Sequence, residues 1–137
     1  MSESGSTHNS DTGYAVANLD DLGQGPGFRK IRSSLGVTAF GANALVLPAG
    51  MSTGWHYHER QEELYFVHAG TVRMTFGDGH EEDLGPGGLA RVDAATHRMI
   101  TNIGDSDAVY VIVGGADGYV GRDGQVPEGK DGPGHGP

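Results

Sequence analysis

The apolar residues of the chain recur in short runs, and many of these runs alternate with polar positions. No window keeps the i, i+3, i+4, i+7 spacing of an amphipathic helix. The runs are rich in residues that favour strands and are closed by Gly, Pro or Asp. A short helical turn is expected only around Leu19–Leu22. The predicted strands are residues 37–47, 54–58, 62–68, 71–76, 80–84, 88–92, 98–103 and 108–114.

Tight turns between these runs support the strand prediction. Gly77-Asp78-Gly79 is typical of a hairpin, because glycine accepts the positive φ that such turns require. Gly85-Pro86-Gly87-Gly88 is a second turn, in which proline pre-sets φ and the glycines allow the chain to reverse. Short strands at this spacing predict an all-β fold, a sandwich or barrel with jelly-roll closure.

The two ends of the chain differ from the middle in composition. Residues 1–13 are rich in Ser, Thr, Asn and Gly, and residues 121–137 carry many Gly and Pro. Both segments are expected to be flexible tails. The folded domain is therefore predicted to span residues 14–120, and 137 residues suit one domain.

Net charge and cysteine content limit the possible partners and metal ligands. The formal net charge of −9 argues against nucleic acid and against an anionic membrane surface, since both attract clustered Lys and Arg. No apolar run is long enough to span a bilayer and the N-terminus lacks the pattern of a signal peptide, so a cytoplasmic location is expected. The chain has no cysteine, so any metal ligands must be His, Asp or Glu.

One segment combines histidines and glutamates at close spacing. His56 and His58 are two residues apart, so on a strand their rings project from the same face, about 6.6 Å apart along the chain. Imidazoles at this spacing can converge on one metal ion. A turn then leads into a strand that begins with Glu62 and Glu63. Only one of these glutamates can share the face of the histidines, and alternation alone leaves the choice open.

This segment resembles the first signature of the cupin superfamily. Gly50, His56, His58, Glu63 and Gly70 match the signature at every defined position. The resemblance implies a cupin jelly-roll β-barrel in which His56, His58 and Glu63 hold a divalent ion, while Glu62 lies outside. Fe, Mn, Ni and Zn are the candidate ions.

The second cupin signature is incomplete in this chain. Counted from Gly87, its proline, glycine, histidine and asparagine positions are occupied by Asp93, Ala95, Arg98 and Asn102. The histidine of that signature supplies the fourth metal ligand in cupins of this type. Here Arg98 stands in its place, and His97 lies one residue earlier.

Two registers of this strand are possible from the sequence. A bulge would bring His97 to the ion as a fourth ligand. Alternatively Arg98 points into the barrel, where a positive charge roughly 5 Å from a dication costs about 3 kcal/mol per unit of ion charge at an effective dielectric of about 20. In that register Arg98 either grips a substrate carboxylate or pairs with Glu63 in a pocket without metal.

Two functions from different classes follow. One is a metal-dependent enzyme acting on a small molecule, a dioxygenase or an isomerase, with its ion on His56, His58 and Glu63. The other is a non-catalytic module that binds or senses an anionic small molecule through Arg98, and Tyr65 is expected to line the mouth of either pocket. Small one-barrel cupins often associate in pairs, so a homodimer is expected, with Gly27–Ile31 as a candidate contact segment.

Overall fold

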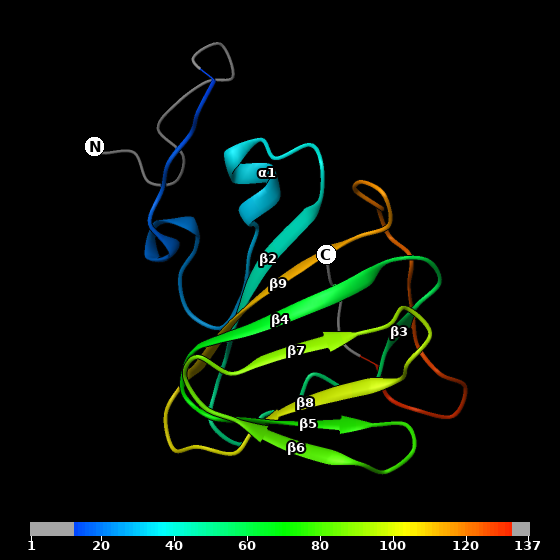
Figure 1. The fold of residues 1–137 in the computed structure, drawn as a ribbon. Coiled ribbons are helices and arrows are strands. Elements are labelled where there is room, and N and C mark those ends of the chain that lie inside the picture. The colour runs from blue at the N-terminus through cyan, green and yellow to red at the C-terminus, as the bar shows by residue number, and fades with distance from the viewer. Residues whose placement is uncertain (1–12, 133–137) are drawn as a thin grey trace.

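The fold was analysed in a computed structural model, which describes residues 13–132. Two sheets face each other and enclose the core (Figure 1). No helix among the described residues combines the length and the apolar character that crossing a membrane requires. The larger sheet has five strands in the order β1 (Gly27–Arg29), β2 (Gly41–Leu47), β9 (Ala108–Gly115), β4 (Glu62–Ala69) and β7 (Leu89–Val92).

The opposite wall is assembled from shorter pieces. Its three-stranded sheet has the order β6 (Glu81–Leu84), β5 (Val72–Phe76) and β8 (Arg98–Asn102). Isolated bridges from Ser52 to Thr101 and from His56 to Arg98 attach the segment before β3 to β8. Strand β3 (Tyr57–His58) then pairs with β10 (Gly124–Gln125). The β-barrel of jelly-roll type predicted from the sequence is thus confirmed.

Alternation along β4 decides which side chains enter the barrel. Glu63, Tyr65 and Val67 are buried, whereas Glu62, Leu64 and Phe66 face outward. This is the period of two that a strand imposes on its side chains. The buried apolar cluster lies between the two walls and consists of Leu45, Leu47, Tyr65, Val67, Val72, Met74, Val92, Ile100, Ala108 and Tyr110.

All eight predicted strands are present, each with at least one shifted end, and the predicted turn at Leu19–Leu22 is a 3-10 helix over the same residues. Strand β1, helix α1 (Ile31–Leu35) and strand β10 were not predicted. Each is five residues or shorter, too short to establish a periodic pattern. Helix α1 ends at Gly36, whose positive φ of 74° closes the helix as a C-terminal cap.

Residues 121–132, expected to belong to a flexible tail, run instead along the barrel wall. Gly124 and Gln125 pair with His58 and Tyr57 in β3. The backbone N–H of Trp55 donates to the carbonyl of Asp131 at 2.7 Å. The many Gly and Pro residues correctly indicated little regular structure in this segment. They could not indicate that part of it pairs with a strand far away in the sequence, because such pairing leaves no local sequence pattern. The expected tail residues 1–12 and 133–137 lie outside the described range.

Backbone conformation explains why two positions of the first signature are glycine. Gly50 and Gly70 have φ angles of 78° and 81°, in the left-handed region that residues with a Cβ avoid. Gly70 also has too little space around it for a side chain. A Cβ built there would lie 2.8 Å from Ala108 Cα and 3.0 Å from the carbonyl oxygen of Asp107, so backbone would have to move.

We predict that Gly70→Ala destabilises the fold more than Gly79→Ala does. Both residues have positive φ, but a Cβ at Gly79 would meet nothing within 4 Å. Gly79→Ala should cost about 1–2 kcal/mol from backbone strain alone. Gly70→Ala should cost about 1–3 kcal/mol more from the contact with Ala108. Urea unfolding of both variants measures the difference, and equal losses would contradict the prediction.

Candidate metal centre

The two histidines reach the interior from the wall segment that bridges to β8. The backbone of His56 exchanges two hydrogen bonds of 3.0 Å with Arg98, which holds this segment in register. The rings of His56 and His58 meet edge to face with centroids 5.2 Å apart. Tyr57, between them, faces the other way and stacks on His97 at 4.6 Å. The predicted same-face placement of the two imidazoles is therefore present.

Glu63 enters the same space from the opposite wall. Its Oε2 lies 3.3 Å from His58 Nε2, and its Oε1 lies 3.8 Å from His56 Nε2. One ligand atom from each of His56, His58 and Glu63 falls within 4.8 Å of the other two. Glu62 lies on the outer face beside Arg91, at 3.2 Å. The choice of Glu63 over Glu62, which rested on the cupin resemblance, agrees with this geometry.

Asp123 orients His58 from behind. Its Oδ1 lies 2.7 Å from His58 Nδ1, and its Oδ2 accepts the backbone N–H groups of Arg60 and Gln61 at 2.8 and 3.0 Å. The side-chain amide of Gln61 also donates to Asp123 at 2.6 Å. A carboxylate on the outer ring nitrogen turns the other nitrogen toward the centre, as at many metal-binding histidines. Asp123 was missed because it is 65 residues from His58 and lies in the supposed tail.

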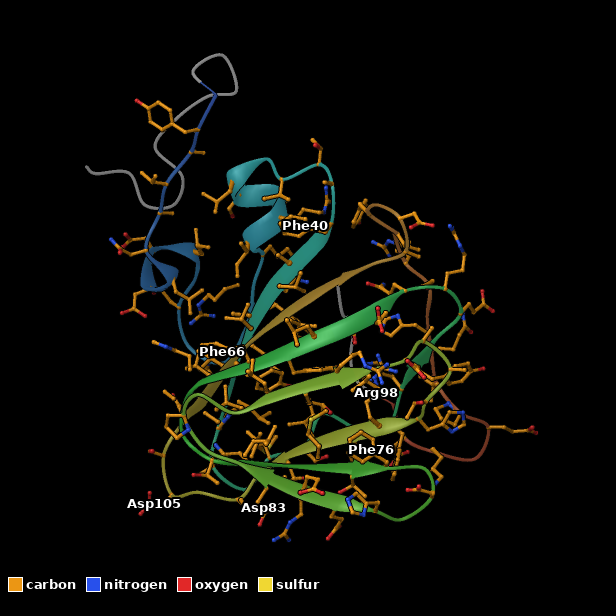
Figure 2. The ribbon with its side chains drawn as sticks, in the orientation of Figure 1. Phe40, Phe66, Phe76, Asp83, Arg98 and Asp105 are labelled. Carbon is orange, nitrogen blue, oxygen red and sulfur yellow. The ribbon has the colours of Figure 1, made fainter. Side chains whose placement is uncertain are left out.

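Arg98 points into the barrel, and its side chain is fully engaged. The residue is 0% exposed. Nη2 donates to Glu63 Oε1 at 2.6 Å, and Nε donates to the hydroxyl of Tyr65 at 3.3 Å. Nη1 donates to three carbonyls of the loop before β8, those of Asp93, Ala94 and Thr96. Figure 2 shows Arg98 between the two walls.

These contacts correct three sequence-based expectations. Strand β8 pairs with β5 without a bulge, and His97 lies on the other face against Tyr57, away from the expected fourth-ligand position. Arg98 is fully buried and its guanidinium bonds Glu63, Tyr65 and loop carbonyls, so the pairing with Glu63 that the sequence left open is present and a grip on a substrate carboxylate is not favoured. Tyr65 is 2% exposed and donates its hydroxyl to Glu63 Oε1 at 2.6 Å, which makes it a support for Glu63.

The charges of the centre set the protonation of its members. Burial alone raises the pKa of Glu63, but the two nearby histidines and the charge of Arg98 hold that pKa far below the ordinary value. Burial lowers the pKa of His56. Burial also opposes charge on His58, yet the carboxylates of Glu63 and Asp123 raise its pKa. Glu63 is therefore ionised, and it is the anionic group of the cluster.

The donor atoms left over fit a divalent ion. His56 Nδ1 and His58 Nε2 are buried and form no hydrogen bond, a costly state for a polar atom, and the one described carboxylate near His58 Nε2 is that of Glu63, 3.3 Å away. Both hydrogen bonds that Glu63 accepts end on Oε1, which leaves Oε2 on the side of His58. Two imidazoles and one carboxylate form the donor set of a facial triad. The adjacent charge of Arg98 weakens the attraction of this set for a cation without blocking its free donors.

Comparison with known proteins agrees with the geometry. A model of the cupin domain matches residues 44–114, more than half of the chain. The chain belongs to the cupin family. No curated protein matches this cupin at the sequence level.

Solved structures with the same fold come from several bacteria. One is described as a sugar phosphate isomerase of the cupin superfamily from Silicibacter pomeroyi, with 24% identity, a TM-score of 0.60, and coverage of 76% of this cupin and 73% of that chain. An uncharacterised double-stranded β-helix protein from Klebsiella pneumoniae has 16% identity, a TM-score of 0.67, and coverage of 82% and 96%. A predicted oxalate decarboxylase from Thermotoga maritima has 22% identity, a TM-score of 0.56, and coverage of 64% and 76%. At these identities the likeness establishes the fold alone.

We predict that Arg98→Met strongly destabilises the metal-free cupin. The substitution keeps an unbranched side chain but leaves the Glu63 carboxylate buried without its cation. Breaking one half of a buried ion pair costs about 3–5 kcal/mol. The double variant Arg98→Met/Glu63→Gln removes both charges and should regain part of that loss. Urea unfolding in the presence of a chelator measures both effects, and a loss below about 1 kcal/mol for the single variant would contradict the prediction.

Proposed function

We propose that this cupin binds one divalent metal ion through His56, His58 and Glu63 and acts on a small molecule next to it. The observation that carries the proposal is the pair of partnerless imidazole nitrogens, His56 Nδ1 and His58 Nε2. These side chains and the Glu63 carboxylate supply ligand atoms within 4.8 Å of one another. Buried polar atoms are normally paired, so an ion that pairs them explains their arrangement.

The protein groups around the ion have separate tasks. Asp123 keeps Nδ1 of His58 engaged, so Nε2 stays directed at the centre. Arg98 and Tyr65 both bond Glu63 Oε1 and so keep the carboxylate from rotating. A bound divalent ion would supply Lewis acidity, polarising a carbonyl or hydroxyl oxygen of the ligand. Three protein ligands leave other positions of the ion open to such a molecule.

An enzyme suits this arrangement better than a binding module built on Arg98. A module that binds an anionic molecule through Arg98 needs a free guanidinium, whereas Arg98 is buried and bonded to Glu63, Tyr65 and loop carbonyls. We propose a metal-dependent reaction on a small polar molecule, an isomerisation or a dioxygenation, with Fe, Mn, Ni or Zn as the ion. Two proteins of similar fold, described as a sugar phosphate isomerase and a predicted oxalate decarboxylase, support chemistry on a small polar molecule.

Elemental analysis tests the metal site. Protein purified without a chelator or a metal-affinity tag should carry about one ion per chain, and His56→Ala should remove it, because two remaining ligands hold an ion poorly. Asp123→Asn should weaken affinity by about 10- to 100-fold through the orientation of His58.

His97→Ala is the matched control, since His97 stacks on Tyr57 on the other face. It should keep the metal content of the unaltered protein. Absence of metal after incubation with each of Fe²⁺, Mn²⁺, Ni²⁺ and Zn²⁺ would overturn the proposed function.

We also propose that the cupin forms a homodimer through its larger sheet. The outer face of this sheet exposes Leu64, Phe66 and Leu89 by 45%, 40% and 61%. Phe66 and Leu89 are directly paired across β4 and β7, which makes the apolar surface continuous. Strand β1, within the Gly27–Ile31 segment expected to form a contact, is an edge strand of the same sheet. Exposed apolar patches of this kind mark interaction surfaces.

Light scattering after size exclusion measures the assembly. The unaltered chain should elute with about twice its mass of 14.3 kDa, and Phe66→Glu should elute as a monomer because a carboxylate cannot be buried in an apolar contact. Met51→Glu changes another exposed apolar residue, one outside this sheet, and should leave the dimer intact. A monomeric unaltered protein would refute the homodimer.

A further inference from the structure

A cavity of about 280 Å³ extends from Glu63 along the inner face of the larger sheet. Its floor comes from the ends of β2, β9 and β4, where Gly41, Gly114 and Glu63 lie across from one another. Its rim comes from helix α1 and from residues 119–122. The cavity therefore opens beside the candidate metal centre and is bounded by elements that the sequence did not predict.

The charge of this cavity is opposite to that of the whole chain. Lys30, Arg32 and Arg122 line it, and Glu63 is the one acidic residue among the lining side chains. The chain as a whole has a net charge of −9. None of the three cations forms an ion pair with another described residue, whereas Arg73, Arg91 and Arg98 do. Unpaired cations gathered around a cavity attract an anionic ligand.

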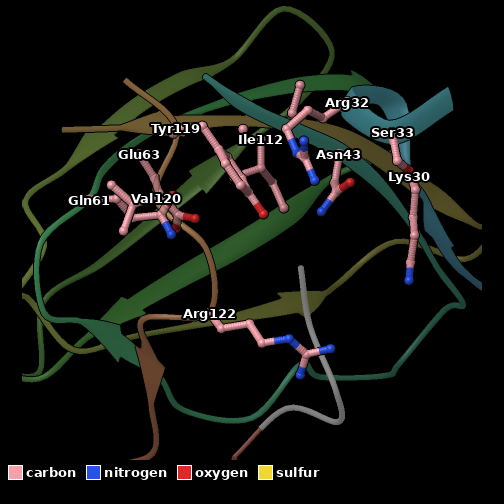
Figure 3. A pocket seen from close by; sticks show the side chains of 13 residues that line it. Lys30, Arg32, Ser33, Asn43, Gln61, Glu63, Ile112, Tyr119, Val120 and Arg122 are labelled. Carbon is pink, nitrogen blue, oxygen red and sulfur yellow. The ribbon is translucent and has the colours of Figure 1, made fainter. Parts of the chain in front are cut away.

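Asn43 supplies an independent indication of a polar ligand. The residue is 8% exposed, lies on β2 and lines the cavity. Its side-chain amide has no hydrogen-bond partner among the described residues, whereas the side chain of Asn102, another buried asparagine, makes three such bonds. Figure 3 shows the Asn43 amide beside the Arg32 guanidinium, both turned into the cavity. A nearly buried amide without a partner is suited to bond a ligand.

Two arginines at the rim of the cavity, Arg32 and Arg122, have features that bear on ligand binding. The guanidinium of Arg32 lies 3.8 Å from the centre of the Tyr119 ring, so stacking fixes its direction. Arg122 has a φ of 48°, one of two non-glycine residues with positive φ in the described chain. Such a backbone conformation is strained in a residue that carries a Cβ, and strain of this kind is concentrated at ligand-binding sites.

The pairing of strands β2, β9 and β4 gives the distance between this cavity and the candidate metal centre. Asn43 pairs with Ile112 across β2 and β9, and Ile112 pairs with Tyr65 across β9 and β4. Two strand spacings, about 10 Å, therefore separate the backbone at Asn43 from that at Tyr65, near Glu63. A small molecule can span this distance with one end at the cations and the other at the metal ligands.

We propose that Lys30, Arg32, Arg122 and Asn43 bind the oxyanion group of the substrate, a phosphate or a carboxylate, while the rest of the substrate reaches the metal centre. Arginine offers paired N–H donors that match both groups. The substrate class is then a small phosphorylated or carboxylated molecule. This inference rests on the proposed function for the reacting end of the substrate, but the oxyanion site itself requires no metal.

Titration of the full-length, chelator-treated protein tests the oxyanion site. Inorganic phosphate should bind saturably and shift the backbone amide NMR signals of residues 30–33, 41–43 and 119–122. Arg32→Gln and Arg122→Gln should each weaken this binding by about tenfold, the effect of losing one hydrogen bond to a charged group. Arg122 is exposed, so its variant retains the fold. Parallel titrations with malonate and acetate show whether phosphate or carboxylate is preferred.

Arg91→Gln is the matched control, because it removes the same charge from the outer face, where Arg91 pairs with Glu62 and Asp93. It should bind phosphate like the unaltered protein. No saturable binding of any of the three anions, or equal weakening in all three variants, would overturn the oxyanion site.

Metal content, measured on the same variants, separates the two proposals. Arg32→Gln and Arg122→Gln should keep the metal content of the unaltered protein, since neither residue is among the metal ligands. Anion binding without metal leaves the oxyanion site standing and overturns the metal function. Metal binding without any anion binding overturns the oxyanion site alone.

Discussion

The ion pair between Arg98 and Glu63 is the interaction on which the centre of this cupin depends. It joins β8 in one wall to β4 in the other, and both residues are at least 95% buried. Neither charge is tolerable there without the other, because a lone buried charge costs several kcal/mol. The same guanidinium also bonds three carbonyls of the loop before β8, so loop, wall and carboxylate are held together by one side chain.

This pairing changes the electrostatics of the metal ligands. Arg98 stands where cupins with the complete second signature have a fourth ligand, so it both removes a donor and adds a positive charge. The remaining set has two imidazoles and one carboxylate whose Oε1 is already engaged. Glu63 Oε2 and the free imidazole nitrogens are left to the ion. The expected result is weaker metal binding and more open coordination positions than in a four-ligand centre.

The candidate metal centre and the cation-lined cavity have Glu63 in common, and in the proposed function they are the two ends of one substrate site. At one end, donors without partners face a position suited to a cation. At the other end, Lys30, Arg32 and Arg122, which form no ion pair with another described residue, line the same cavity as the Asn43 amide. A molecule with an anionic group and a reactive polar group matches this polarity. The fold sets the orientation, since the register of β2, β9 and β4 fixes the spacing between the ends.

The sequence alone determined the β architecture and the common face of His56 and His58, because strand alternation and fixed spacing are local properties. With the cupin resemblance it also selected Glu63 over Glu62. It could not determine whether His97 or Arg98 enters the barrel, since a one-residue shift exchanges them and only pairing of β8 with β5 excludes it. Asp123, Lys30, Arg32 and Arg122 reach the site from short segments with no periodic pattern. Their places were decided by tertiary contacts between residues far apart in the chain, which local propensity does not encode.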